Sequence, residues 1–387
     1  MFSNESVKLD ILKKRAYNLR WATVPDGTIP LTAADPDFPC AEPIRKALTN
    51  YARDGYFSYG PAEGLLEFRN SLSLHYANKY KVNYRPDFIL PIDSAASGIH
   101  LICKTFLKPL DEAIIFDPVD FLFRLSVESV HATAVTFPIP QTNMEMDFSS
   151  LELFINERTK MICLCNPLNP TGKVFTKKEL TQLGNIAVKY NLLILSDEIW
   201  SEIIFAPHGF TSISSLDEEI KKRTVTVTGF SKSYGLASLR VGAILCSDFE
   251  SYEKIFQSSL SQFTVGGCNA AGQIAATAAL NECQDWLEQF VLHLSKMRSL
   301  CVDSLNQIKN FSCLPPEGCF VAFVNIAKTG MSSQAISDKL MKEAKVAVVP
   351  GLKQWFGEGA EGYIRISFAT SEHILTEALD RIKKTMN

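Results

Sequence analysis

Two cations in a segment of small residues could hold an aldehyde and a phosphate together. The segment Gly-Phe-Ser-Lys-Ser-Tyr-Gly-Leu-Ala-Ser-Leu-Arg ends at Arg240 and places Lys232 eight residues before it. A lysine amine can form a Schiff base with an aldehyde, and arginine with serine suits a phosphate. Pyridoxal 5'-phosphate carries both groups, so the segment suggests a site for this cofactor. Ser, Lys and Gly are also ordinary loop residues, and the segment alone also fits a basic loop at a strand end.

Two further polar groups follow apolar runs. The sequence Asn166-Pro-Leu-Asn-Pro-Thr-Gly172 follows the run Met161–Cys165. Asp197 follows a second such run. Because ligands of open α/β sheets bind at the carboxyl ends of parallel strands, we expect Asn169 and Asp197 at one edge of a sheet. An aspartate there can keep a pyridine nitrogen protonated, which makes the ring an electron sink. The simpler interpretations are a proline-rich turn and a capped strand end.

The elements that would position these groups alternate between strands and helices. Short apolar runs separated by helical patterns are typical of βαβ units on a mostly parallel sheet. Helices are predicted over Lys177–Tyr190 and Asn269–Phe290, and Leu287–Ile308 continues the helical pattern. The predicted strands are Ala113–Phe116, Ala134–Pro138, Met161–Cys165, Leu192–Ser196, Thr224–Thr228 and Val241–Cys246.

The pattern changes to α+β near Phe320, which indicates a second domain. A chain of 387 residues also exceeds the usual size of one hydrophobic core. We expect an N-terminal arm and part of the small domain in residues 1–44, a large cofactor-binding domain in 45–285 and a small domain in 286–387. The elements predicted for the last part are strand Val321–Ile326, helix Ser333–Glu343, strands Val346–Val349 and Tyr363–Ser367, and a helix from Ser371.

The composition favours small-molecule chemistry. The net charge is -3, which gives no electrostatic attraction for nucleic acid. No stretch approaches the roughly 18 apolar residues of a membrane span, and the first residues lack the apolar core of a secretory signal. We therefore expect a cytoplasmic protein with neither a membrane nor a nucleic-acid partner. The ten cysteines form no C-x-x-C pair and the six histidines no ligand spacing, so we expect no metal site.

Taken in order, these motifs resemble those of the class I/II aminotransferases, which are pyridoxal-phosphate enzymes of fold type I. The resemblance extends from about residue 30 to the end of the chain. It implies a large domain with a mostly parallel seven-stranded sheet, and a smaller α+β C-terminal domain. The stretches that carry it are Leu31–Phe38, Tyr59–Gly64, Asn166–Gly172, Ser196–Trp200, Ser231–Arg240, Pro350–Gly351 and Gly362–Ser367.

The resemblance also implies a role for individual residues. Lys232 would form the Schiff base and carry the proton, and Asp197 would pair with the pyridine nitrogen. Asn169 would hydrogen-bond the phenolic oxygen of the cofactor, and Arg365 would bind the carboxylate of the substrate. Tyr59 would reach the phosphate from the second subunit of a homodimer. The remaining cofactor contacts would be Ser231, Arg240 and the backbone of Ala95 and Ala96, and Ala34 and Asn169 would also contact the substrate.

Four positions depart from the family pattern. Asp120 occupies the place of the aromatic ring that usually stacks on the cofactor, so Phe121 or Phe123 would have to substitute. Trp200 replaces a tyrosine that donates to the phenolic oxygen, and its indole N–H can still donate. The other two departures are Ser94 in place of a glycine and Gly229 in place of a serine that binds phosphate.

We expect an aminotransferase that moves an amino group from an amino acid to a 2-oxo acid. A C–S β-lyase of the cystathionine β-lyase type is the alternative, because Ala34-Asp-Pro-Asp-Phe38 resembles a segment of those enzymes. Trp200, where they carry a histidine, and Arg240, which they usually lack, argue against it. A non-catalytic regulator that binds the cofactor is a further alternative, but no DNA-binding segment fits in the first 30 residues.

Overall fold

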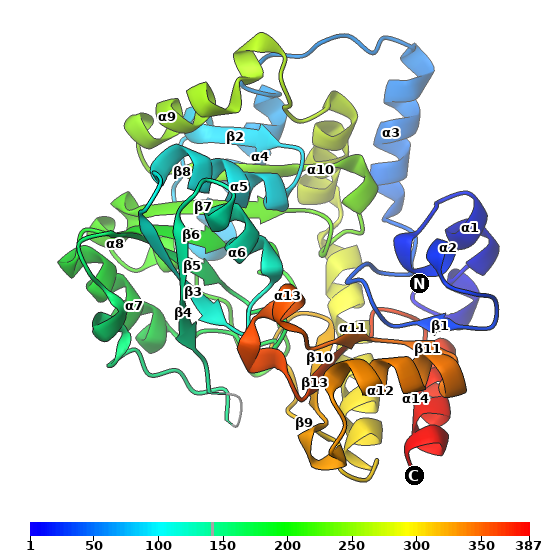
Figure 1. Ribbon diagram of the computed structural model, residues 1–387. Helices are drawn as coiled ribbons and strands as arrows, with labels where there is room; N and C mark the ends of the chain where they lie inside the picture. The colour runs from blue at the N-terminus through cyan, green and yellow to red at the C-terminus, as the bar shows by residue number, and fades with distance from the viewer. Residues whose placement is uncertain (141–142) are drawn as a thin grey trace.

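A seven-stranded, mostly parallel sheet lies at the centre of the upper part of the molecule in Figure 1. The computed structural model describes residues 1–140 and 143–387. The strand order is β2-β8-β7-β6-β5-β3-β4; β8 is antiparallel to both of its neighbours, and the pairs from β7 to β4 are parallel. The strands are β2 (Ile89–Ile92), β3 (Glu112–Asp117), β4 (Thr133–Pro138), β5 (Thr159–Cys165), β6 (Leu193–Asp197), β7 (Thr224–Gly229) and β8 (Gly242–Cys246).

Each face of this large sheet packs against its own hydrophobic core. Side chains alternate along β8, so that Ala243 and Leu245 belong to one core and Ile244 and Cys246 to the other. Strands buried on both faces read as continuous apolar runs, which explains why their positions could be predicted from the sequence. The six predicted strands agree with the structure within two residues at each end; β2 was not among them.

Helices cover both faces of the large sheet and continue into the lower part of the molecule (Figure 1). Gly98 allows α5 to approach the sheet closely, because a Cβ there would lie 2.5 Å from Ile92 Cδ1. The helices are α1 (Leu9–Lys14), α2 (Leu19–Thr23), α3 (Glu42–Asp54), α4 (Leu66–His75), α5 (Ala95–Phe106), α6 (Phe121–Glu128), α7 (Lys177–Lys189), α8 (Glu218–Lys222), α9 (Phe249–Ser259), α10 (Ala270–Glu282), α11 (Gln284–Asn306), α12 (Ser333–Lys339), α13 (Lys353–Phe356) and α14 (Glu372–Met386).

Two smaller sheets form the lower part of the molecule. A four-stranded antiparallel sheet has the order β12-β13-β10-β9, and β1 pairs in parallel with β11. The pairing of β1 with β11 joins the N-terminal segment to the C-terminal part of the chain. The strands are β1 (Ile29–Pro30), β9 (Ser312–Cys313), β10 (Val321–Asn325), β11 (Val346–Ala347), β12 (Val349–Pro350) and β13 (Tyr363–Ser367).

Three predicted boundaries differ from the structure. The helix predicted over Asn269–Phe290 is interrupted at Cys283, which leaves helical geometry while the apolar pattern continues across it. The strand predicted over Val346–Val349 is two short strands, β11 and β12, which pair with different sheets. Helix α12 ends at Lys339, and the last turn predicted as α-helix is a π-helical segment over Leu340–Ala344. No described helix is long and apolar enough to cross a membrane.

Candidate active site

A cavity of about 560 Å³ lies at the carboxyl ends of the parallel strands. Asp197 ends β6, Asn169 lies in the loop after β5, and Lys232 follows β7. Ten of the eleven residues predicted for the site line this cavity, and they come from both the large sheet and the C-terminal strands. They are Ala34, Ala95, Ala96, Asn169, Asp197, Trp200, Ser231, Lys232, Arg240 and Arg365.

Tyr59 is the exception. It is 91% exposed and lines a different hollow of the surface, together with residues of the 261–273 segment. The structure therefore does not bring Tyr59 to the site of its own chain. Its predicted role across a subunit interface stays a prediction.

Lys232 presents its amine inside the cavity. The Nζ atom donates a hydrogen bond to the carbonyl of Ala34 over 2.7 Å and lies 5.3 Å from the centre of the Trp200 ring. Burial lowers the pKa of Lys232, since a charged amine is less stable away from water. Asp35, Asp120 and Asp197 act in the opposite direction, while the positive charge of Arg365 adds to the lowering. The amine therefore loses its proton more readily than an ordinary lysine.

Asp197 provides a buried carboxylate in the same cavity. It is 7% exposed, and one of its oxygens accepts a hydrogen bond from the backbone N–H of Ile199 over 3.0 Å. Burial, together with the nearby charge of Asp120, raises the pKa of Asp197 to about 7, although the N–H of Ile199 and the charge of Lys232 act in the opposite direction. A protonated ring nitrogen placed against this carboxylate would stabilise its ionised form. Asp197 therefore suits a cationic ligand group.

Arg365 reaches the cavity from β13 in the small sheet. Its side chain donates to Asn169 Oδ1 over 3.0 Å and to the carbonyl of Thr32 over 3.1 Å, and its guanidinium lies 5.1 Å from the centre of the Phe356 ring. The residue is 8% exposed, and its Nε atom is buried without a hydrogen-bond partner among the described residues. Arg365 lines the cavity, and its Nη1 and Nη2 atoms each carry a second N–H that suits a ligand carboxylate.

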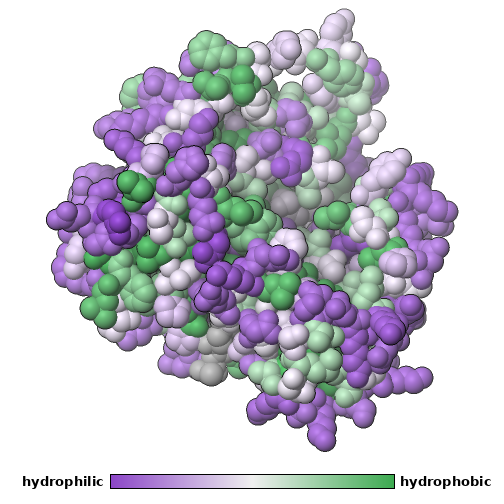
Figure 2. Space-filling model, in the orientation of Figure 1, coloured by the Kyte–Doolittle hydropathy of each residue, from purple (hydrophilic) through white to green (hydrophobic). Residues whose placement is uncertain are grey.

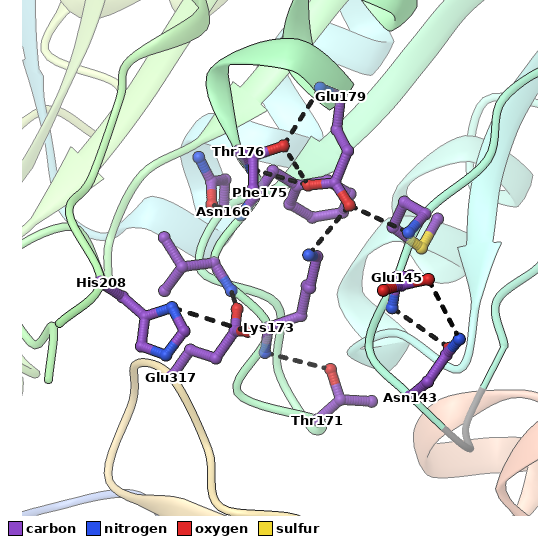
Figure 3. A network of polar contacts seen from close by, with 12 residues as sticks. Asn143, Glu145, Asn166, Thr171, Lys173, Phe175, Thr176, Glu179, His208 and Glu317 are labelled. Carbon is purple, nitrogen blue, oxygen red and sulfur yellow. Dashed lines mark hydrogen bonds and ion pairs between the residues drawn. The ribbon is translucent and has the colours of Figure 1, made fainter. Parts of the chain in front are cut away.

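Polar contacts hold both ends of the loop that carries Asn169, and Figure 3 shows those of Asn166, Thr171 and Lys173. Asn166 accepts from the backbone of Phe175 over 3.1 Å and donates to the carbonyl of Thr211 over 3.2 Å. Beyond the loop, Lys173 forms an ion pair of 3.0 Å with Glu179, whose carboxylate also completes a capping box at the start of α7. These contacts keep the loop in one conformation.

The start of α5 and the loop after β7 provide the groups that suit a phosphate. Ala95 and Ala96 form the first turn of α5, where backbone N–H groups lack intrahelical partners. Gly242 lies beneath this turn, and a Cβ there would lie 3.2 Å from the backbone nitrogen of Ala95. Ser231 and Arg240 line the same cavity. Hydroxyl, guanidinium and free N–H groups together form a set of donors for an anion.

The aromatic side chains around the cavity have different surroundings. Trp200 is 2% exposed and packs edge-on against Phe320, with ring centres 4.7 Å apart. Phe123 is 1% exposed and belongs to the core of the large sheet. Phe121 is partly exposed and lies edge-on to Trp355, with ring centres 5.4 Å apart. Of the two phenylalanines, Phe121 is thus the more accessible from the cavity.

Several residues of the site were missed by sequence reasoning. Asp120 was treated only as a departure from the family, but its carboxylate accepts a hydrogen bond of 2.7 Å from Asn169. Trp355 and Phe356 come from α13 and have no sequence signal of a function. Glu198, next to Asp197, is buried and accepts from Ser212 over 2.7 Å, but it does not line the cavity. The sequence signal that could have identified Asp120 as a site residue is its position shortly after the end of strand β3.

A separate cavity of about 240 Å³ lies next to the end of the Asn166–Gly172 loop. Thr171 and Lys173 line it, together with residues of β10 and β13, and none of the residues predicted for the site does. Among the described residues, no group of three or more histidine, cysteine or acidic side chains could hold a metal ion. The cavity lined by Asp197, Lys232 and Arg365 is therefore the candidate site.

Comparison with known proteins agrees with this geometry. Residues 26–382 match the family described as aminotransferase class I and II. The chain is 31% identical to aromatic-amino-acid aminotransferase 2 of Thermococcus litoralis, over 93% of this chain and 92% of that protein. The solved structure of the aromatic aminotransferase of Pyrococcus horikoshii covers 94% of this chain and 97% of its own, with 29% identity and a TM-score of 0.87.

The structure of cystalysin from Treponema denticola, which contains pyridoxal 5'-phosphate, has a TM-score of 0.91 at 21% identity and covers 100% of this chain and 98% of its own. At that identity it shows a shared fold alone. The chain belongs to the class I and II aminotransferase family and has the fold type I architecture. It is an aminotransferase dependent on pyridoxal phosphate, as its sequence predicted.

The cavity fits this cofactor. It combines one amine, one buried carboxylate and a set of anion donors in a volume of about 560 Å³. Lys232 suits the aldehyde, Asp197 the ring nitrogen, and the start of α5 with Arg240 the phosphate.

Proposed function

We propose that Lys232 bonds the cofactor and then carries the proton of the reaction. The position of its amine carries this proposal, because Nζ lies in the cavity with Asp197, Asn169 and Arg365. The bound cofactor supplies an aldehyde and a ring that accepts electron density from Cα of the substrate. Once displaced by the substrate amine, Lys232 takes the proton from Cα and returns it on the path to the 2-oxo acid. Its lowered pKa favours the free amine that this step needs.

The other residues of the cavity bind and orient the cofactor and the substrate. Asp197 holds the ring nitrogen in its protonated form, and Asn169 donates to the phenolic oxygen. Ser231, Arg240 and the backbone of Ala95 and Ala96 would hold the phosphate, and the indole N–H of Trp200 would provide a donor for the phenolic oxygen. Arg365 binds the carboxylate of the substrate, and the carbonyl of Ala34 faces the amine of Lys232 next to the substrate.

Reduction of the loaded protein with borohydride tests this assignment. The treatment should attach the cofactor to Lys232, as found by mass analysis of peptides, and the Lys232→Ala protein should lose the visible absorbance that responds to amino acids. Lys173, a second buried lysine close to the Asn169 loop, is an internal control. A label on Lys173, or an unchanged spectrum in Lys232→Ala, would refute the proposal.

We propose amino donors with apolar or aromatic side chains. Lys232, Arg240 and Arg365 are the lysines and arginines among the described residues that line the cavity, and each already has a proposed role. The apolar side chains that line the cavity include Leu19, Phe121 and Trp355, of which the last two are in contact. In a panel of amino acids, phenylalanine and leucine should convert the bound cofactor to its amine form faster than aspartate. A preference for aspartate would refute this choice of substrate.

The β-lyase alternative differs in what becomes of a substrate with sulfur at Cβ. With cystathionine, an aminotransferase should release little pyruvate, whereas a lyase releases pyruvate, ammonia and homocysteine. Arg240, which such lyases usually lack, and Trp200, where they carry a histidine, favour transamination. Rapid stoichiometric release of pyruvate without the amine form of the cofactor would replace the proposed reaction by the lyase reaction.

We propose that the functional unit is a homodimer in which Tyr59 serves the site of the partner subunit. Large apolar side chains are exposed along the 56–66 and 260–265 segments, and Figure 2 shows green side chains at the top of the molecule over these segments. They include Tyr56 and Phe57 after α3, and Phe263 and Val265 after α9. Burying such a surface against a second copy would be favourable.

We also propose a cytoplasmic location and the division of the chain at residues 44/45 and 285/286. The ten cysteines are all free thiols, which suits a reducing compartment. The pairing of β1 with β11 supports grouping the N-terminal arm with the small domain.

A further inference from the structure

Asp120 places a second carboxylate inside the cavity, at the position where the resemblance implies an aromatic ring. One of its oxygens accepts from the backbone N–H of Leu122 over 3.1 Å and so caps the start of α6. Its other oxygen, Oδ2, accepts from Asn169 Nδ2 over 2.7 Å. The cap alone would need only the first of these contacts.

The second contact joins Asp120 to Arg365 through one amide. Asn169 donates to Asp120 with its nitrogen and accepts from Arg365 with its oxygen. If this amide turned over, its nitrogen would face the guanidinium and its oxygen the carboxylate, and both hydrogen bonds would be lost. The two charged groups therefore select the same orientation of Asn169 from opposite sides.

Asp120 also lies among the charges that surround Lys232. The groups that act on the Lys232 amine are the carboxylates of Asp35, Asp120 and Asp197 and the guanidinium of Arg365. Burial raises the pKa of Asp120, while the N–H of Leu122, the charges of Arg365 and Lys232, and the Asn169 amide act in the opposite direction. An ionised Asp120 favours a protonated nitrogen at Lys232.

We propose that Asp120 is a positioning residue of this active site, which fixes Asn169 and Arg365 in one orientation and adds a negative charge beside Lys232. This proposal rests on the assignment of Lys232 as the residue that bonds the cofactor. It gives Asp120 a function in place of the ring stacking that its side chain cannot provide.

Two variants test the charge of Asp120 and its contact with Asn169. Asp120→Asn keeps one oxygen for the α6 cap but removes the charge, and its amide nitrogen replaces the oxygen that accepts from Asn169. In the cofactor-loaded variant, the Lys232 nitrogen that bonds the cofactor should lose its proton about one pH unit lower than in the wild type, as followed by visible absorbance. The reason is that a nearby anion no longer stabilises the protonated form of this nitrogen. Asp120→Ala also removes the α6 cap, and in both variants the KM for the amino donor should rise about 10-fold more than kcat falls, because Asn169 no longer holds Arg365 in one orientation.

The alternative is that Asp120 only caps α6. Asp217→Asn is a matched control, since Asp217 caps α8 through Ile220 and does not line the cavity. It should leave both the titration and KM unchanged. If Asp120→Asn does not fold, Asp120→Ser retains a cap and can be titrated in the same way.

Two results distinguish the ways in which this reasoning could fail. A wild type that forms no visible band with the cofactor would refute the assignment of Lys232 itself. A normal band whose titration and KM are the same in the wild type, Asp120→Asn and Asp120→Ala would refute only the role of Asp120.

Discussion

Replacing Arg365 by alanine tests how the site binds the carboxylate of its substrate. The guanidinium is held by Asn169 Oδ1 at 3.0 Å and by the carbonyl of Thr32 at 3.1 Å, so its orientation is set before the substrate arrives. A hydrogen bond to a charged group contributes about 1.5–3 kcal/mol, which corresponds to roughly 10–100-fold in kcat/KM. Arg365→Lys retains the charge without the planar fork and should lie between the alanine variant and the wild type.

The assay is the conversion of the bound cofactor by an amino donor, followed by visible absorbance at several donor concentrations. Arg298→Ala is a matched control, because Arg298 also lies over a phenylalanine ring, at 4.8 Å, and donates to a backbone carbonyl at 3.1 Å, but does not line the cavity. The control should show normal kcat/KM. An Arg365→Ala enzyme within threefold of the wild type would refute the proposed role of this arginine.

Three further predictions concern the carboxylates and the subunit interface. Asp197→Ala should bind some cofactor but lose roughly a thousandfold in turnover, because no carboxylate then stabilises the protonated ring nitrogen. Near-normal turnover would show that Asp197 has only a structural role at the end of β6. Burial raises the pKa of Glu198 to about 7, so the folded state binds a proton that the unfolded state has released, and stability should fall as the pH rises from about 4.5 through 7, by about 3 kcal/mol. Glu198→Gln should reduce this fall in urea unfolding at pH 5 and 8, and an identical pH dependence would contradict the burial argument. Mixing Tyr59→Phe with Lys232→Ala subunits should restore part of the activity, since one site of a mixed dimer carries neither change; fully active monomers at assay dilution would contradict a shared site.

The sequence could predict the chemistry because the groups that react are tied to strand ends. Asp197 and Lys232 follow strands whose apolar runs are visible in the chain, and parallel strands bring their carboxyl ends to one edge. The seven-stranded sheet and the small C-terminal sheet agree with the fold that the motifs implied. The break at Cys283 could not be predicted, because the apolar pattern of α10 continues into α11 without interruption.

Only the tertiary structure decided which distant groups share the cavity. Asp120, Asn169 and Arg365 form one hydrogen-bonded chain, although 49 and 196 residues separate the partners in its two contacts. The carbonyl of Ala34 meets Lys232 across 198 residues because β1 pairs with β11 and brings the N-terminal segment over the strand ends. Residue types and periodicity specify each element locally, whereas contacts between elements depend on how the sheets pack, which no local pattern records.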